Sequence, residues 1–283
     1  MKLVDIKDLK SLPIGSASSS LAEGTTKIMI KLHFTFDKAK KSQDLKKKLL
    51  TKYKNSSPQS ANVIVVAGGD GYMLNSLKKY VKFNKPFYGI NCGTFGFLMN
   101  KPVEGNIVKK INLSKKVYIK PLQVEITTNK NKKKLLAINE VSLFRQSRQT
   151  VSLNLKIGKK NIIKKLIGDG VLVSTPAGST AYNLSVHGPI LSLNSNKIAI
   201  TPISPFRPRR WKGRIVSNIK KIKIENLDSV KRPVACVADN IEIRNIKSIK
   251  VSISKKVIFC LLYDKDRSLV KRIKLEQKRQ KLN

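Results

Sequence analysis

The hydrophobic pattern of the chain centres on residues 63–66, where four β-branched residues follow one another. An uninterrupted apolar run of this kind is typical of a strand that is buried on both faces of a parallel sheet. The run ends in the glycine-rich turn 68–71, after which apolar residues recur at helical spacing. These residues are Met73, Leu74, Leu77 and Val81. The pattern predicts a strand, a tight turn and a helix in direct succession.

The neighbouring segments repeat this order. Residues 27–32 and 86–91 read as strands that precede and follow the central one in the chain. Ser42 could cap a helix between them. The apolar face of that helix would hold Leu45, Leu49, Leu50 and Tyr53. Strands that alternate with helices through short links predict a parallel, doubly wound α/β sheet.

From about Val117 the pattern changes to alternation at every second residue. It is clearest at 151–157, 222–224, 241–243 and 249–253, and it predicts strands with one buried and one solvated face. Many such strands and few helical patterns indicate a second, mostly antiparallel β domain.

These changes divide the chain into four parts. A polar extension covers residues 1–24, the α/β domain 25–116, the β domain 117–262, and a basic C-terminal segment 263–283. The last segment shows helix-like spacing at Leu269, Ile273 and Leu275. We expect it to return to the first domain.

The turn at 68–71 is the first candidate for chemistry. Ligands of open α/β sheets bind at the carboxyl ends of strands, and glycines there let backbone N–H groups approach a phosphate. Asp70 is the one side chain of the turn that can accept a proton. Aspartate is also common in ordinary turns, and neither GxGxxG nor GxxxxGK[ST] is present. The turn alone therefore leaves both interpretations open.

Two segments interrupt the alternation in the β half. Asn139 and Glu140 are adjacent within residues 135–144, which are otherwise apolar and read as one strand. Because strand neighbours point to opposite faces, at least one of them should lie where a ligand or a buried network satisfies it. In the second segment, 168–185, an apolar strand ends in Ser-Thr-Pro, and Ser179 begins a stretch that favours a helix N-terminus. Its hydroxyls could bind ribose and phosphate, with an ordinary loop as the alternative.

Composition narrows the function less than these motifs do. Among 283 residues, 58 Lys and Arg against 17 Asp and Glu give a net charge of +41, which suits a nucleic-acid binder or a binder of anionic metabolites. The lysines alternate with Ile and Leu, as on solvated faces, and we favour that interpretation. The basic cluster 206–214 could grip RNA, but a surface loop or a subunit contact is the interpretation that we prefer.

The cysteines and the hydropathy indicate a cytoplasmic chain without a membrane segment. Cys92, Cys236 and Cys260 form no CxxC pair, so neither a disulfide framework nor a zinc site is expected. No apolar run reaches the roughly 18 to 20 residues that span a bilayer. His33 and His187 show no catalytic or metal-binding pattern.

Four ordered motifs together resemble the NAD kinase family. They are GGDG at 68–71, NCGTFGFL at 91–98, INEV at 138–141 and GDGVLVSTPAGSTAYNLS at 168–185. GGDG alone also resembles the turns of phosphofructokinases and of diacylglycerol or sphingoid-lipid kinases, whereas its combination with NE and STPAGSTAY is specific. The resemblance implies a Rossmann-like domain plus a β-sandwich, with the active site between them, and a homodimer or homotetramer.

The resemblance also implies a reaction, namely transfer of the terminal phosphoryl group of ATP or polyphosphate to the 2′-hydroxyl of the adenosine ribose of NAD, giving NADP. Asp70 would match the general base, with Gly71 leaving room for phosphates, and Mg²⁺ would enter on the donor. Asn139 and Glu140 would match the NAD-contacting pair. Further binding positions would be Asp169, Ala177, Thr180, Ala181, Tyr182, Asn183, Leu184, Ser185 and Asp239.

Two positions depart from the family pattern. Ala238-Asp239-Asn240 replaces a longer Asp-Gly-Gln-like turn, and Ile167 stands where many members have Arg or Lys. Two alternatives from other classes remain open at this point. A lipid kinase would need an apolar acyl slot or a membrane-binding face, and a nucleic-acid binder would show a steep inverse salt dependence.

Overall fold

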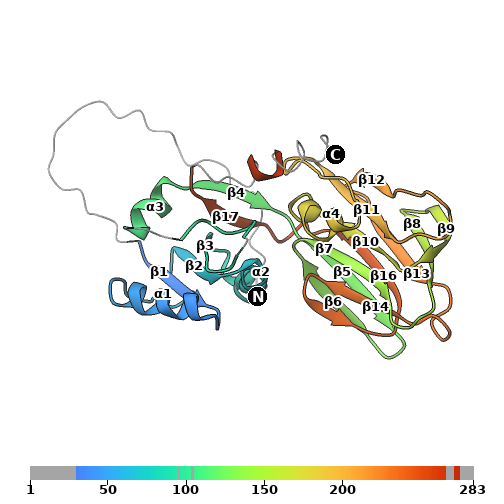
Figure 1. The fold of residues 1–283 in the computed structure, drawn as a ribbon, viewed down its shortest axis with the longest axis horizontal. Helices are drawn as coiled ribbons and strands as arrows, with labels where there is room; N and C mark the ends of the chain where they lie inside the picture. The colour runs from blue at the N-terminus through green and yellow to red at the C-terminus, as the bar shows by residue number, and fades with distance from the viewer. Residues whose placement is uncertain (1–29, 95, 103–104, 266–270, 275–283) are drawn as a thin grey trace, which may run out of the picture.

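The computed structural model describes residues 30–94, 96–102, 105–265 and 271–274, which form an α/β layer beside a β-sandwich (Figure 1). The five-stranded sheet contains, in spatial order, β1 (Leu32–Phe36), β2 (Val63–Gly68), β3 (Phe87–Asn91), β17 (Phe259–Tyr263) and β4 (Lys115–Ile119). β1, β2, β3 and β17 are parallel, and β4 joins β17 in the antiparallel direction. The helices of this layer are α1 (Lys40–Leu50), α2 (Asp70–Tyr80) and α3 (Ile107–Leu113), with a 3-10 turn, η2 (Val81–Phe83).

Strand β2 explains why helices cover both faces of this sheet. All six of its residues are buried. Ile64 and Val66 belong to the apolar cluster that includes residues of α2, whereas Val63 and Val65 belong to the cluster that includes residues of α1 and α3. Because strand neighbours point to opposite faces, the β-branched run needs an apolar partner on each side. The prediction of a doubly wound arrangement is confirmed.

The β-sandwich consists of two six-stranded antiparallel sheets. One contains β12 (Arg214–Ser217), β11 (Lys197–Ile203), β10 (Gly170–Ser174), β7 (Glu140–Arg145), β14 (Val234–Ala238) and β15 (Ile241–Ile243). The other contains β6 (Lys132–Ala137), β5 (Leu122–Thr128), β16 (Ile246–Ile253), β13 (Ile222–Asn226), β8 (Val151–Ile157) and β9 (Lys160–Gly168). A single apolar cluster fills the space between them. The predicted fold class, α/β plus β-sandwich, is confirmed.

Some predicted boundaries are wrong. The first strand begins at Leu32 rather than at residue 27, and residues 27–29 lie outside the described part. Helix α1 begins at Lys40, and Ser42 does not cap it, because the Ser42 hydroxyl donates to the carbonyl of Ala67 at 2.8 Å. The serine therefore ties the helix to β2 instead of starting it.

The predicted single strand across 135–144 is also wrong. β6 ends at Ala137 and β7 begins at Glu140 in the other sheet, so the chain crosses the sandwich at Ile138 and Asn139. The crossing is stabilised by hydrogen bonds from both backbone N–H groups to one carboxylate, that of Asp239. Alternation in the sequence does not reveal such a crossing, because the partner lies about a hundred residues further along the chain.

The α/β sheet contains strands from both sides of the sandwich segment of the chain. β4 and β17, which flank the sandwich in sequence, both belong to the α/β sheet. The change of pattern near Val117 therefore precedes the change of sheet at Leu122. Residues 271–274 are helical, and Ile273 is buried in the same apolar cluster as Met73 of α2. The other two positions of the predicted helical spacing, Leu269 and Leu275, lie outside the described residues.

Candidate active site

The turn between β2 and α2 places a carboxylate beside open space. Asp70 is the first residue of α2, and Gly69 is its N-cap with extended backbone. A Cβ on Gly68 would lie 2.7 Å from Asp37 Oδ2 and 3.0 Å from Tyr72 Cβ, so these side chains would have to move. At Gly69 and Gly71, in contrast, a Cβ would have no described atom within 4 Å. The N-terminus of the helix is thus free to receive an anion, which its dipole and N–H groups favour.

The Asp70 carboxylate is held by the loop that follows β3. It accepts hydrogen bonds from the backbone N–H of Phe97 at 2.6 Å and of Leu98 at 2.9 Å. These donors lie in the NCGTFGFL segment, so the structure brings the first two motifs together. The Arg272 guanidinium in turn donates to the carbonyl oxygens of Gly96, Phe97 and Met99 at 2.5–2.8 Å.

The surroundings of Asp70 shift its pKa in opposite directions. Burial raises the pKa of its carboxyl, while the two backbone hydrogen bonds and the charge of Arg272 lower it. Burial is the largest of these causes, so the net direction is upward. A carboxylate with a raised pKa accepts a proton from a hydroxyl more readily than an ordinary aspartate does.

The other two motifs meet around Asn139. The Thr175 hydroxyl donates to the carbonyl of Ile138 at 2.7 Å, and the Thr175 N–H donates to that of Asn139 at 2.9 Å. A Cβ on Gly178 would lie 2.2 Å from Asn139 O, so only glycine permits this contact. The Ser-Thr-Pro-Ala-Gly loop therefore packs directly on the backbone that carries Asn139 and Glu140.

Glu140 is a buried carboxyl with unmet hydrogen-bonding capacity. Its residue is 9% exposed, and its Oε2 has no hydrogen-bond partner among the described residues. Burial, and then the negative charge of Asp239, raise its pKa from 4.5 to about 8. Buried polar atoms normally have partners, so this oxygen is an exception among the described residues.

Glu140 belongs to the lining of a cavity of ≈ 530 Å³ on the β7–β14–β15 side of the sandwich. The lining residues are Glu140, Ser142, Phe144, Arg145, Gln146, Tyr182, Ala235, Val237, Asp239, Glu242 and Arg244. The Arg145 Nε donates to Asp169 Oδ1 at 2.5 Å, which fixes Asp169 near this cavity. Burial, followed by the charges of Asp169 and Glu140, raises the pKa of Tyr182. Three predicted site residues thus lie close to one another.

Both parts of the site lie on one apolar cluster. Met73 of α2, Ile138 before Asn139, and Ala177 of the loop after β10 belong to it. The cluster continues from the α/β layer into the sandwich. The turn that carries Asp70 and the segment that carries Asn139 therefore pack on the same group of apolar side chains.

Comparison with known proteins decides the family. The model of the ATP-NAD kinase N-terminal domain matches residues 16–112, and that of the ATP-NAD kinase C-terminal domain matches residues 138–258. This chain belongs to the NAD kinase family. It is therefore a phosphotransferase that acts on NAD, and the lipid-kinase and nucleic-acid alternatives are set aside.

Individual relatives agree with this assignment. An NAD kinase of Caulobacter vibrioides is 42% identical over 87% of this chain and 95% of its own length, and one of Zymomonas mobilis is 42% identical over 85% and 93%. Among solved structures, an NAD kinase from Archaeoglobus fulgidus in complex with ATP has a TM-score of 0.68 at 21% identity, over 88% of this chain and 99% of that chain. Yeast NADH kinase complexed with NADH also has a TM-score of 0.68, at 24% identity, over 79% and 68%. These two confirm the fold.

The remaining predicted site residues lie in the segment that follows β10. η3 (Ala177–Thr180) and α4 (Tyr182–Ser185) replace the helix expected from Ser179. The Ser179 hydroxyl caps nothing, since it donates to Pro176 O at 2.7 Å and accepts from Leu191 N at 3.0 Å. Thr180, Ala181, Leu184 and Ser185 are partly or fully exposed on these turns.

Asn183 is different from its neighbours in this motif. It is fully buried, its amide nitrogen donates to the carbonyls of Ser179 and Pro189, and its Oδ1 accepts from the Thr201 hydroxyl at 2.7 Å. Its side chain therefore holds the turn in place. A direct contact of Asn183 with the dinucleotide stays a prediction.

Several residues of this NAD kinase site were not predicted from the sequence. Arg145 pairs with Asp169, Arg272 holds the loop that binds Asp70, and Lys78 forms an ion pair with Asp239. In a chain with 58 Lys and Arg, nothing in the sequence marks these three cations. Thr175 was visible as part of its motif, but its bonds to Ile138 and Asn139 were not.

The structure also places the basic cluster 206–214 and the three cysteines. In the 206–214 cluster, Trp211 packs against the core of the sandwich and the Arg207 guanidinium lies 4.8 Å from the Phe206 ring centre. Cys92, Cys236 and Cys260 are free thiols. No helix in the described part is long and apolar enough to cross a membrane. The described residues also contain no cluster of three or more His, Cys, Asp or Glu side chains.

Proposed function

We propose that this NAD kinase transfers the terminal phosphoryl group of ATP, or of polyphosphate, to the 2′-hydroxyl of the adenosine ribose of NAD, giving NADP. Asp70 serves as the general base. The observation that carries the proposal is the position of the Asp70 carboxylate, which is oriented by two backbone N–H groups beside the open space at Gly69 and Gly71.

The phosphoryl transfer proceeds in line. As the ribose oxygen forms its bond to the terminal phosphorus, its proton moves to the Asp70 carboxylate, and the electron pair of the broken P–O bond stays on the leaving diphosphate. The glycine turn and the N-terminus of α2 stabilise negative charge on the phosphates. The loop at Phe97 and Leu98 keeps the base in place before a substrate arrives, so little reorganisation is needed during the reaction.

The sandwich holds the dinucleotide in this proposal. The unpartnered Oε2 of Glu140 forms a hydrogen bond with a ribose hydroxyl, and Tyr182 stacks on a base from its 39% exposed position. Asp169, fixed by Arg145, contributes a second acceptor.

A divalent cation, most suitably Mg²⁺, accompanies the phosphate donor. The described residues form no acidic cluster that would cage it, and Mg²⁺ often binds through substrate phosphates with one or two carboxylates. The phosphate oxygens would hold the ion, and its charge would neutralise that of the phosphates. The open volume at Gly69 and Gly71 suits a phosphate–metal group of this kind.

The test is product analysis with separate substrates. Purified protein is incubated with NAD or NADH, and with ATP or polyphosphate, each with and without Mg²⁺. We expect a 2′-phosphorylated dinucleotide with at least one donor and none without the metal. Phosphorylation at another hydroxyl, or none with any donor, would refute the proposal.

A further inference from the structure

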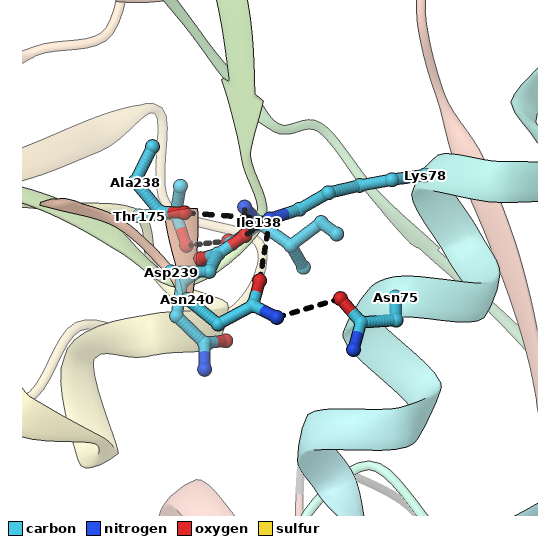
Figure 2. Close-up of polar contacts among 8 residues, drawn as sticks. Asn75, Lys78, Ile138, Thr175, Ala238, Asp239 and Asn240 are labelled. Atoms are coloured by element: carbon cyan, nitrogen blue, oxygen red, sulfur yellow. Dashed lines mark hydrogen bonds and ion pairs between the residues drawn. The ribbon is translucent and has the colours of Figure 1, made fainter. Parts of the chain in front are cut away.

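Helix α2 begins at the Asp70 turn and makes polar contacts with the sandwich two turns later (Figure 2). Its first residue is Asp70, and two turns later Lys78 Nζ lies 2.9 Å from Asp239 Oδ2 at the tip of the β14–β15 hairpin. Lys78 also donates to Asn240 Oδ1 at 3.2 Å, and Asn240 Nδ2 donates to Asn75 Oδ1 at 2.7 Å. We call Asn75, Lys78, Asp239 and Asn240 the interdomain clamp.

On the sandwich side, Asp239 organises the residues next to the dinucleotide. Its carboxylate accepts from the backbone N–H groups of Ile138 and Asn139, both at 2.8 Å. Its own N–H donates to the carbonyl of Glu140 at 3.0 Å. Asp239 has φ of 53°, a conformation that aspartate adopts more readily than most residues. One residue thus holds the backbone of three successive positions, of which two are site residues.

The charges of the clamp depend on each other. The side chain of Asp239 is 0% exposed and that of Lys78 is 14% exposed. Among the described residues, Lys78 provides the one cation within 4 Å of the Asp239 carboxylate. Removing a single partner from a buried pair leaves the other charge uncompensated, which is far more damaging than loss of a surface pair.

The clamp adds directional contacts to the junction between the layers. The layers are joined by the β4–β5 and β16–β17 connections and by the shared apolar cluster. Hydrophobic contacts tolerate sliding, whereas an ion pair with two hydrogen bonds sets a distance and an angle. Asp70 and Lys78 are about 12 Å apart along one rigid helix, so displacing the Lys78 end also displaces the base.

We propose that Lys78 is a positioning residue for phosphoryl transfer, which it supports by holding the Asp70 helix at a fixed distance from Asn139 and Glu140 through Asp239. The inference rests on the proposed function. A misplacement of about 1 Å at the reacting groups lowers rates by about 10²-fold, whereas the dinucleotide surface of the sandwich stays intact.

The test compares three variants: Lys78→Met, Lys78→Arg and, as matched control, Lys79→Met. Lys79 is exposed on the same helix and lies 5.2 Å from the Tyr80 ring centre. We expect Lys78→Met to lower kcat about ten-fold or more, while the Kd of NAD from calorimetry changes less than about three-fold. Lys78→Arg should restore kcat to within about three-fold, since it keeps the charge. If Lys78→Met does not fold, Lys78→Gln replaces it under the same criteria.

Two results would overturn the inference. One is a kcat of Lys78→Met equal to that of the Lys79→Met control. The other is an equal loss of kcat and NAD affinity in both Lys78 variants, together with a lowered melting temperature, because that would show general destabilisation.

A second readout separates this inference from the proposed function. Hydrogen exchange at the amides of Ile138 and Asn139 should accelerate about ten-fold or more in Lys78→Met, because loosening of Asp239 exposes them. Unchanged exchange would refute the clamp, whatever the activity. If the wild-type protein makes no NADP but Lys78→Met shows this acceleration, the proposed function is refuted and the clamp is supported.

Discussion

The carboxyls of Asp70 and Glu140 lie on the two sides of the site and differ in their partners. Asp70 accepts two backbone hydrogen bonds, whereas Glu140 Oε2 has no partner among the described residues. Burial raises the pKa of both, but only for Asp70 do donors and a cation oppose it. The difference separates two tasks. In the proposed function, the base is oriented before the substrate arrives, and the binding group keeps hydrogen-bonding capacity for its ligand.

Asp239 extends the comparison. Like Asp70, it accepts from two consecutive backbone N–H groups and has a cation near it, but its side chain is fully buried. In the proposed function, the same arrangement of donors therefore serves catalysis at Asp70 and scaffolding at Asp239. Burial, rather than the pattern of hydrogen bonds, distinguishes the two aspartates.

The largest effect is expected at Asp70. Asp70→Asn keeps the size and one acceptor oxygen but cannot take a proton, so kcat should fall by about 10² to 10⁴-fold, the usual contribution of a general base. Steady-state NADP formation measures it, with NAD affinity from calorimetry as the second quantity. Asp44→Asn, on the exposed face of α1, is the control. A turnover of Asp70→Asn near that of the control would exclude Asp70 as the base.

The unpartnered Glu140 predicts a pH-dependent stability. Its folded-state pKa of about 8 exceeds the ordinary value of 4.5, so between these values the folded protein holds a proton that the unfolded chain releases. The free energy of unfolding should therefore decrease as pH rises through this window, by at most roughly 1.4 kcal/mol per pH unit. Asp239, itself paired with Lys78, and Tyr182 are the titratable groups that face Glu140.

Glu140→Gln should remove this decrease. Chemical denaturation at pH 5, 6.5 and 8 measures it, and the variant should gain on the wild type as pH rises. Glu242→Gln is the control, because Glu242 lines the same cavity but its side chain is 47% exposed and pairs with Arg244. Parallel curves for Glu140→Gln and wild type would show that Glu140 has a partner in solution.

The sequence predicted the surroundings of Asp70 better than those of Glu140. Around Asp70, the β-branched run of β2 and the helical spacing after it are local patterns, and both elements were found as expected. Around Glu140, the apolar stretch 135–144 suggested one strand, but the chain crosses between sheets there. The crossing depends on Asp239 and Thr175, which are far away in sequence, and a period of two carries no information about them.

The difference between local patterns and distant contacts also explains which candidate site residues were predicted from the sequence. Asp70, Asn139, Glu140 and Asp169 belong to motifs that the family resemblance supplies. Lys78 and Arg272 do not, because each is one basic residue in a strongly basic chain and acquires its place only through folding. Asp239 was predicted as a binding position, and the structure adds a structural task that its turn gave no sign of.

Two glycine substitutions should have effects of intermediate size, one on the stability of the protein and the other on the binding of the phosphate donor. Gly178→Ala would place a Cβ 2.2 Å from Asn139 O, so we expect the protein to lose about 1–3 kcal/mol of stability, as in other overpacked sites. Gly69→Ala meets no described atom within 4 Å and should cost at most about 1 kcal/mol, because alanine is a poorer N-cap residue than glycine, yet raise KM for the phosphate donor. Denaturation and donor titration of both variants test this, and equal destabilisation would contradict it.

The smallest effect is expected at Arg145, on the sandwich side of the comparison. Its ion pair with Asp169 is about one-third exposed, so solvent screens it, and Arg145→Gln should cost less than about 1 kcal/mol of stability. The pair nevertheless orients Asp169, and its loss should weaken NAD binding a few-fold without changing kcat at saturation. Arg244→Gln is the control, because Arg244 is 70% exposed and lines the same cavity. An Arg145→Gln variant that binds NAD as tightly as this control would show that Asp169 needs no orientation from Arg145.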